Sequence, residues 1–145
     1  MRKLTLVIPI VLLVSGCQTS DVSLTTSSTP VAVTGAAAGA IAGDMASRLA
    51  EQIGSAGETT IKLEKDTTEY AAALEAALKE WGYAVITDKE SGKDQTPVEV
   101  SYSLNIIDGQ ILAQLTTSSV SLGRAYTATA GGAVPSSPLS ILQRN

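Results

Sequence analysis

The first seventeen residues limit how much of this chain is available to fold. Arg2 and Lys3 form a short basic start, an apolar run covers residues 4–14, and the chain's single cysteine, Cys17, follows closely. A membrane-spanning helix needs roughly 20 apolar residues, so this run is too short to cross a bilayer. The pattern predicts a secretory signal that is removed, and the fold must be built from what remains.

The residues around the cysteine indicate the kind of signal. The stretch LVSGC, residues 13–17, resembles a bacterial lipobox, in which the thiol accepts a diacylglycerol thioether and the freed amine is acylated. Two or three acyl chains give stable anchoring, whereas a single chain gives only marginal binding. Gln18 follows, which in lipoproteins of Gram-negative bacteria implies sorting to the outer membrane. We therefore predict a signal peptide over residues 1–16 and a lipid on Cys17; the alternative is an ordinary signal peptide with a free cysteine.

Composition excludes several classes of function. The chain has 145 residues, no histidine and one cysteine. Ser-His-Asp and Cys-His catalysis, histidine-ligated metal sites and an intrachain disulfide are therefore excluded. Loss of residues 1–16 would remove 2 of the 10 basic residues and none of the 14 acidic ones, which leaves a net charge of −6. An acidic chain of this kind is not expected to bind nucleic acid directly.

Carboxylates are the remaining candidates for chemistry. They form two groups, Glu64, Asp66 and Glu69 at the start of a predicted helix, and Asp88, Glu90 and Asp94 in a predicted loop. Acidic residues are common in both places for structural reasons. A hydrolase that uses carboxylates alone is thus a weak alternative. We expect no enzyme activity, no metal and no cofactor apart from the covalent lipid on Cys17.

Residues 17–33 are predicted to be a flexible lipidated tether. The run over residues 18–30 is rich in Ser and Thr and has too little apolar content to fold alone. Fully extended, it would reach roughly 40 Å at about 3.3 Å per residue. We favour a plain tether over the alternative that it adds a strand to the sheet edge of a partner.

A glycine-spaced amphipathic helix is predicted over residues 34–54. Gly35, Gly39 and Gly43 are four residues apart and so share one side of it. Glycine costs about 1 kcal/mol relative to alanine inside a helix, so a benefit must offset it, and close approach by another helix is one. The apolar stripe contains Ile41, Met45, Leu49 and Ile53. The glycines are thus a candidate contact either within the domain or with another subunit, and the sequence does not favour one over the other.

A strand–helix–strand unit is predicted next. Residues 59–64 alternate as a half-buried strand does, and residues 83–87 form a second strand. Asp66 is predicted to cap the intervening helix, with Glu69 completing a capping box, and Gly82 to end it. The predicted buried face of this helix is Tyr70, Leu74, Ala77, Leu78 and Trp81. The unit fits either a βαβ crossover or a helix laid across an antiparallel sheet.

The last third of the chain is predicted to be β. Strand patterns run from residue 98 and over residues 111–120 and 121–129, with an Asp-Gly hairpin turn at residues 108–109. Residues 131–138, with two glycines together and two prolines, are predicted to be loop. The apolar end, residues 139–142, is expected to pair with a partner's edge or with its own sheet. Residues 124–126, Arg-Ala-Tyr, are interpreted as sheet-edge residues, with a partner contact as the alternative.

Together these patterns predict an α+β fold. A small sheet is built from the strand–helix–strand unit and an antiparallel β-meander, and it is preceded by the glycine-spaced helix and the lipidated tether. The predicted division is a signal peptide over residues 1–16, a tether over 17–33, a helix over 34–54 and an α+β periplasmic domain over 59–145.

Several stretches resemble the TrbH family of lipoproteins from the Trb mating-pair-formation system of conjugative plasmids. They are residues 43–54, residues 76–85, and the tail through residues 122–127 and 137–140, together with the lipobox. The resemblance covers nearly all of the mature chain. It implies a structural role in a type IV secretion apparatus for conjugal DNA transfer, near the outer membrane and beside its larger channel-forming subunits. It supplies no catalytic residues.

We therefore expect a lipid-anchored outer-membrane protein whose domain faces the periplasm and helps to assemble that apparatus. Its expected partners are membrane lipid and other secretion subunits, with self-association as a further option and no direct contact with nucleic acid. The alternative is a generic outer-membrane lipoprotein that acts as an assembly or chaperone-like factor for another membrane protein.

Overall fold

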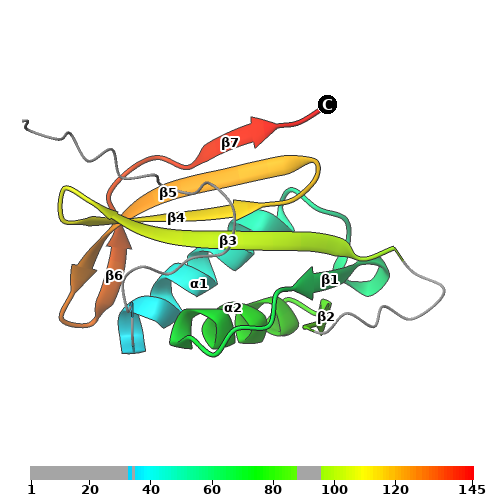
Figure 1. The fold of residues 1–145 in the computed structure, drawn as a ribbon, viewed down its shortest axis with the longest axis horizontal. Helices are drawn as coiled ribbons and strands as arrows, with labels where there is room; N and C mark the ends of the chain where they lie inside the picture. The colour runs from blue at the N-terminus through cyan, green and yellow to red at the C-terminus, as the bar shows by residue number, and fades with distance from the viewer. Residues whose placement is uncertain (1–32, 34, 88–95) are drawn as a thin grey trace, which may run out of the picture.

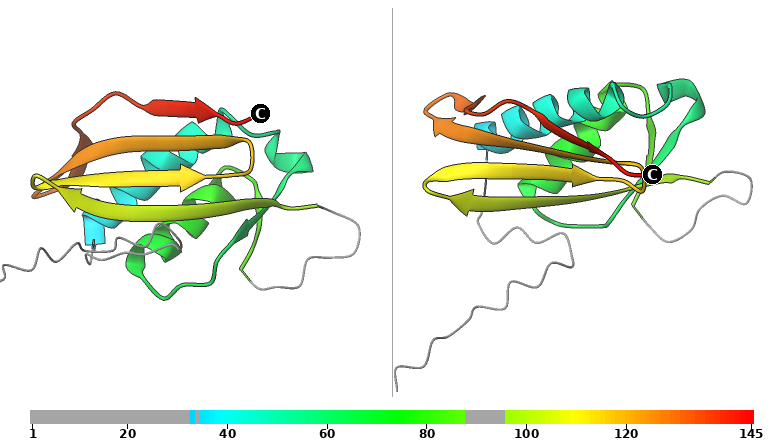
Figure 2. Two further views of the ribbon diagram at one scale, coloured as in Figure 1. Left: turned by 45° about the horizontal axis from the view of Figure 1, so that its top comes forward. Right: turned by 90° about the horizontal axis from the view of Figure 1, so that it is seen from above.

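Two helices cover one face of a seven-stranded sheet (Figures 1 and 2). The computed structural model describes residue 33, residues 35–87 and residues 96–145. The strand order is β2-β1-β3-β4-β5-β6, and β7 also pairs with β5. The predicted α+β class is confirmed, with parallel pairing at one end of the sheet and antiparallel pairing through the rest.

The strand–helix–strand unit is a parallel βαβ crossover. Strand β1 (Thr60–Leu63) follows a short 3-10 turn, η1 (Ala56–Glu58), and leads through helix α2 (Glu69–Glu80) to strand β2 (Ala84–Ile86). β1 pairs in parallel with β2 on one side and with the start of β3 on the other. Of the two arrangements that the sequence permitted, the crossover is the one formed.

The start of α2 differs from the prediction, and its end agrees with it. The N-cap is Thr68, whose hydroxyl accepts from the backbone N–H of Ala71 at 3.2 Å, and Asp66 instead accepts from Thr68. Trp81 is the C-cap residue and is 52% exposed, so its predicted place in the core was wrong. Gly82, with φ of +95°, ends the helix directly after Trp81, as predicted. Tyr70, Leu74 and Leu78 are buried as predicted.

The meander is built from three antiparallel strands, β3 (Val98–Ile107), β4 (Gln110–Thr116) and β5 (Val120–Thr129). The predicted Asp-Gly turn joins the first two, with positive φ at both Asp108 and Gly109, as a tight type I′ hairpin requires. Along each strand buried residues alternate with more exposed ones, which directs one face toward the helices.

The C-terminal residues complete the sheet rather than leave it. Strand β6 (Gly132–Pro135) pairs with the end of β5, so the loop predicted over residues 131–138 contains a strand. Strand β7 (Ser140–Gln143) pairs with the start of β5, which selects the chain's own sheet from the two expected partners. The glycines and prolines of residues 131–138 concealed β6, because short edge strands tolerate both residues.

Helix α1 (Gly35–Ala50) packs into the same core as the sheet and α2. Its buried face consists of Ala38, Ile41, Ala42, Met45, Ala46 and Leu49. These residues join the inward side chains of β3, β4 and β5 in one continuous apolar cluster. The helix is therefore integrated into the domain and is not a separate arm beside residues 59–145.

Candidate functional site

The predicted lipidation residue, Cys17, and the loop carboxylates Asp88, Glu90 and Asp94 lie outside the described residues. Within the described part of the chain, no group of three His, Cys, Asp or Glu side chains is placed to hold a metal ion. The other carboxylate group serves the fold.

Asp66 and Glu69 each tie two parts of the fold together. Tyr102 on β3 donates its hydroxyl to Asp66, and the backbone N–H of Gly35 donates to Glu69. The pKa of Asp66 is lowered, chiefly because it accepts the Tyr102 hydroxyl and also because it accepts from Thr68. These two residues therefore act as structural acceptors, which agrees with the expectation of solvated or structural charge.

The glycine side of α1 faces away from the described core. A Cβ added at Gly35, Gly39 or Gly43 would meet no other described atom within 4 Å, the helix's own nearby backbone apart. The close approach between this helix and the sheet occurs elsewhere. A Cβ at Gly132 of β6 would lie 3.2 Å from the carbonyl oxygen of Ala36. Close packing within the described domain therefore does not explain the glycines at 39 and 43.

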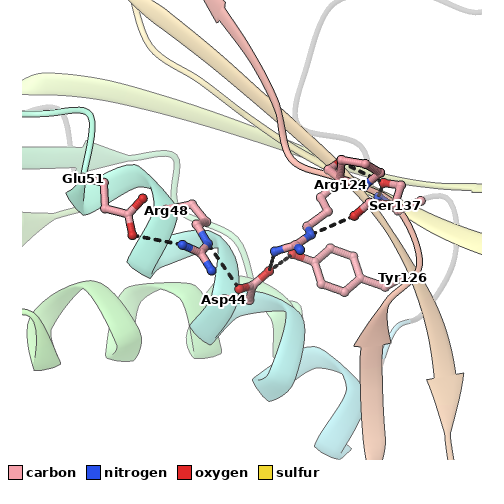
Figure 3. Close-up of polar contacts among 8 residues, drawn as sticks. Asp44, Arg48, Glu51, Arg124, Tyr126 and Ser137 are labelled. Atoms are coloured by element: carbon pink, nitrogen blue, oxygen red, sulfur yellow. Dashed lines mark hydrogen bonds and ion pairs between the residues drawn. The ribbon is translucent and has the colours of Figure 1, made fainter.

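A polar cluster fixes the opposite side of α1 to the sheet (Figure 3). Asp44 accepts from Arg124 Nη1 at 3.0 Å and from the Tyr126 hydroxyl at 2.6 Å, both through Oδ2. Its other oxygen lies 3.6 Å from Arg48 Nε, one turn along the helix. The Arg124 side chain also donates through Nε to the carbonyl of Ser137. One carboxylate thus joins α1 to β5 and to the segment between β6 and β7.

Burial keeps the phenol of Tyr126, which belongs to this cluster, in its neutral form. The pKa of Tyr126 is raised strongly, first by desolvation and then by its hydrogen bond to Asp44, while Arg124 opposes the shift. Tyr126 is 1% exposed and therefore remains a neutral donor. Its hydrogen bond to Asp44 joins β5 to α1, which suits a structural clamp made of Asp44, Arg124 and Tyr126.

Residues 124–126 are not edge residues, so that interpretation was wrong. β5 lies between β4 on one side and β6 and β7 on the other. The gap between the two short strands is filled by Ser137, whose hydroxyl accepts from the backbone N–H of Ala125 at 2.9 Å. Sequence reasoning missed the link to Asp44 because the two sites are 80 residues apart.

A hollow of about 710 Å³ lies where β1 and β2 end, and Leu63, Thr87, Val100 and Thr117 are among the residues that line it. Lys62 and Glu99 pair across its rim at 3.2 Å. The charges around it are balanced in sign, since Glu64 and Lys65 also line it, and nothing in its lining selects one class of ligand.

Comparisons with known proteins identify the family. Residues 19–145 match the family model described as "Conjugal transfer protein TrbH". A curated protein of Sinorhizobium fredii (strain NBRC 101917 / NGR234), named "Probable conjugal transfer protein TrbH", is 63% identical over 148 residues, covering 100% of both chains. The chain belongs to the TrbH family. The resemblance found in the sequence is thereby confirmed.

TrbH membership makes this chain a conjugal transfer component and not a member of an enzyme family. No solved structure matches the chain closely enough to compare folds. In the parts described, neither helix is long and apolar enough to cross a membrane. The Asp44 clamp and the outward-facing glycines of α1 are accordingly features of a conjugal transfer protein.

Proposed function

We propose that this TrbH-family protein is a structural lipoprotein of a conjugative type IV secretion apparatus, anchored to the outer membrane through Cys17 with its domain in the periplasm. The observation that carries the proposal is the match to a conjugal transfer family over residues 19–145, next to a lipobox-like sequence at residues 13–17. The domain then serves assembly, and its partners are other subunits of the apparatus.

The clamp formed by Asp44 with Arg124 and Tyr126 supports an assembly role. Asp44 holds α1 to β5 through a part-buried ion pair and a phenol hydrogen bond, so the helix has a fixed orientation on the sheet. The side that carries Gly39 and Gly43 is turned away from that contact and has no close described neighbour. A helix with small residues on an open side allows another backbone to approach closely. We propose this side as the contact for another subunit.

Membrane attachment gives the first test. Radiolabelled palmitate should label the wild-type protein, and Cys17→Ser should abolish both the label and recovery in the outer-membrane fraction, because the only thiol is lost. Immunoblots confirm that the variant is made. A Cys17→Ser protein that sediments with the outer membrane as wild type does would refute the lipid anchor, while leaving the transfer role to be judged by mating assays.

A further inference from the structure

One edge of the sheet lacks a neighbour over much of its length. β1 pairs with residues 98–100 of β3, and β4 pairs with residues 101–107 on the other side of that strand. Within residues 35–87 and 96–145, no strand lies beside the β1 side of residues 101–107. Every second residue of this stretch therefore directs its backbone N–H and C=O toward an edge that no described strand fills.

The other edges carry the usual protection against strand addition. β2 has only three residues. At the far side, β6 ends in Pro135, Pro138 precedes β7, and Arg144 follows β7. Proline, short length and charge all oppose pairing with another chain.

The open part of β3 has none of these devices. Its sequence, SYSLNII, contains no charge and no proline. Ile106 and Ile107 are 48% and 54% exposed. A long, uncharged edge with exposed branched side chains is the kind that pairs with another strand.

The pattern along this edge complements itself. Tyr102, Leu104 and Ile106 belong to the face that packs on the helices, and Ser103 and Asn105 belong to the other. If a second copy runs antiparallel and the register centres on Leu104, Tyr102 lies opposite Ile106 and Ser103 lies opposite Asn105. Over residues 102–106 apolar residues then face apolar ones and polar residues face polar ones, Ser101 lies opposite Ile107 at each end, and no like charges meet. A two-fold axis also closes such a contact, so it stops at two copies.

We propose that two copies of this protein pair antiparallel through residues 101–107 of β3, so that one sheet continues across a two-fold axis with all four helices on the same face. The second copy covers the part of Ile106 that is exposed in a single chain. This interface is separate from the glycine side of α1, so it does not depend on the assembly role proposed above.

A charge placed in the edge tests the pairing. The full chain carrying Cys17→Ser is compared with Ile106→Lys and with Leu142→Lys, an equal change at the 60% exposed Leu142 on the opposite edge. Sedimentation velocity should show a dimer for the parent and for Leu142→Lys. Ile106→Lys should weaken the dimer by about tenfold or more, because it buries an unpaired charge. Circular dichroism confirms that each variant is folded. A monomeric parent, or a dimer that survives Ile106→Lys, would overturn the proposal.

Cross-linking tests the register. In the same Cys17→Ser background, Asn105→Cys places a thiol diagonally across the axis from its copy, about 7–8 Å away. A short bismaleimide should then give a covalent dimer. Gln114→Cys lies on the same face but one strand inward, opposite Ser103, and should not cross-link. Equal yields of covalent dimer from both variants, or no covalent dimer from Asn105→Cys, would show that the proposed pairing is wrong.

Discussion

At the scale of residues, one carboxylate determines how the first helix sits on the sheet. Asp44 contacts Arg124 and Tyr126 on β5 and Arg48 on its own helix. The side chains of Asp44 and Arg124 are 23% and 18% exposed, so water competes little for their contact. The pair with Arg48 is more exposed, at 38% for the arginine. The two arginines should therefore differ in what they contribute.

The first prediction separates these contacts. Asp44→Ala should lower the free energy of unfolding by about 2 kcal/mol, because it leaves a part-buried guanidinium and a buried phenol without their acceptor. Arg48→Ala should lower it by no more than about 1 kcal/mol, as exposed ion pairs contribute little. Urea denaturation of the Cys17→Ser chain measures both. Equal losses of unfolding free energy in the two variants would show that the contact of Asp44 with β5 stabilises the protein no more than its pair with Arg48 does.

At the scale of elements, the sequence predicted the strands whose residues alternate between apolar and polar. This alternation predicted β1 and the strands of the meander. The Asp108-Gly109 pair predicted the turn, and the positive φ values of both residues confirm it. Strand β6 was missed because it obtains its stability from pairing with β5 and not from a pattern in its own residues. The Asp44–Arg124 pair was invisible because no local period relates residues that far apart.

Helix α2 shows that a residue on the predicted buried face is not always buried at the end of the helix. Leu78 is fully buried, whereas Trp81 at the C-cap is half-exposed. Leu78→Ala should therefore cost about 2–5 kcal/mol, because it leaves a cavity in the core. Trp81→Ala should cost less than about 1 kcal/mol, as surface substitutions do. Thermal or urea unfolding compares the stabilities of the two variants. A larger loss of stability for Trp81→Ala would show that the tryptophan packs in the core.

Helix α1 offers a test of its open glycine side. Gly39→Ala should stabilise the protein by about 1 kcal/mol, since alanine favours the helix and its Cβ meets no described neighbour. Gly132→Ala should destabilise the protein, because φ at this position is +149° and the added Cβ would lie 3.2 Å from the carbonyl oxygen of Ala36. Denaturant unfolding should therefore show a higher free energy of unfolding for Gly39→Ala and a lower one for Gly132→Ala.

Bulk at the same position tests the proposed assembly contact. Gly39→Leu should leave the protein folded and abundant but reduce co-purification of other transfer subunits and the conjugation frequency, with Gly39→Ala milder. Transfer at the wild-type level by Gly39→Leu would mean that no subunit contacts this side. Loss of the folded protein would place the close contact within the domain instead.

At the scale of the whole molecule, the fold separates its surfaces. Both helices cover one face of the sheet, and within the described residues the other face is left uncovered (Figure 2). The clamp and the core make α1, α2 and the sheet a single unit. Such a unit presents its contacts in fixed directions, as the proposed assembly role requires.

Conjugation frequency tests the central claim most directly, namely that this TrbH-family protein supports transfer as a lipid-anchored structural component. A donor strain lacking the gene is complemented with wild type or with Cys17→Ser, and immunoblots confirm equal protein levels. The account predicts that the deletion lowers transfer, that wild type restores it, and that the unanchored variant does not. Transfer by the deletion strain at the wild-type frequency, or full rescue by Cys17→Ser, would contradict it.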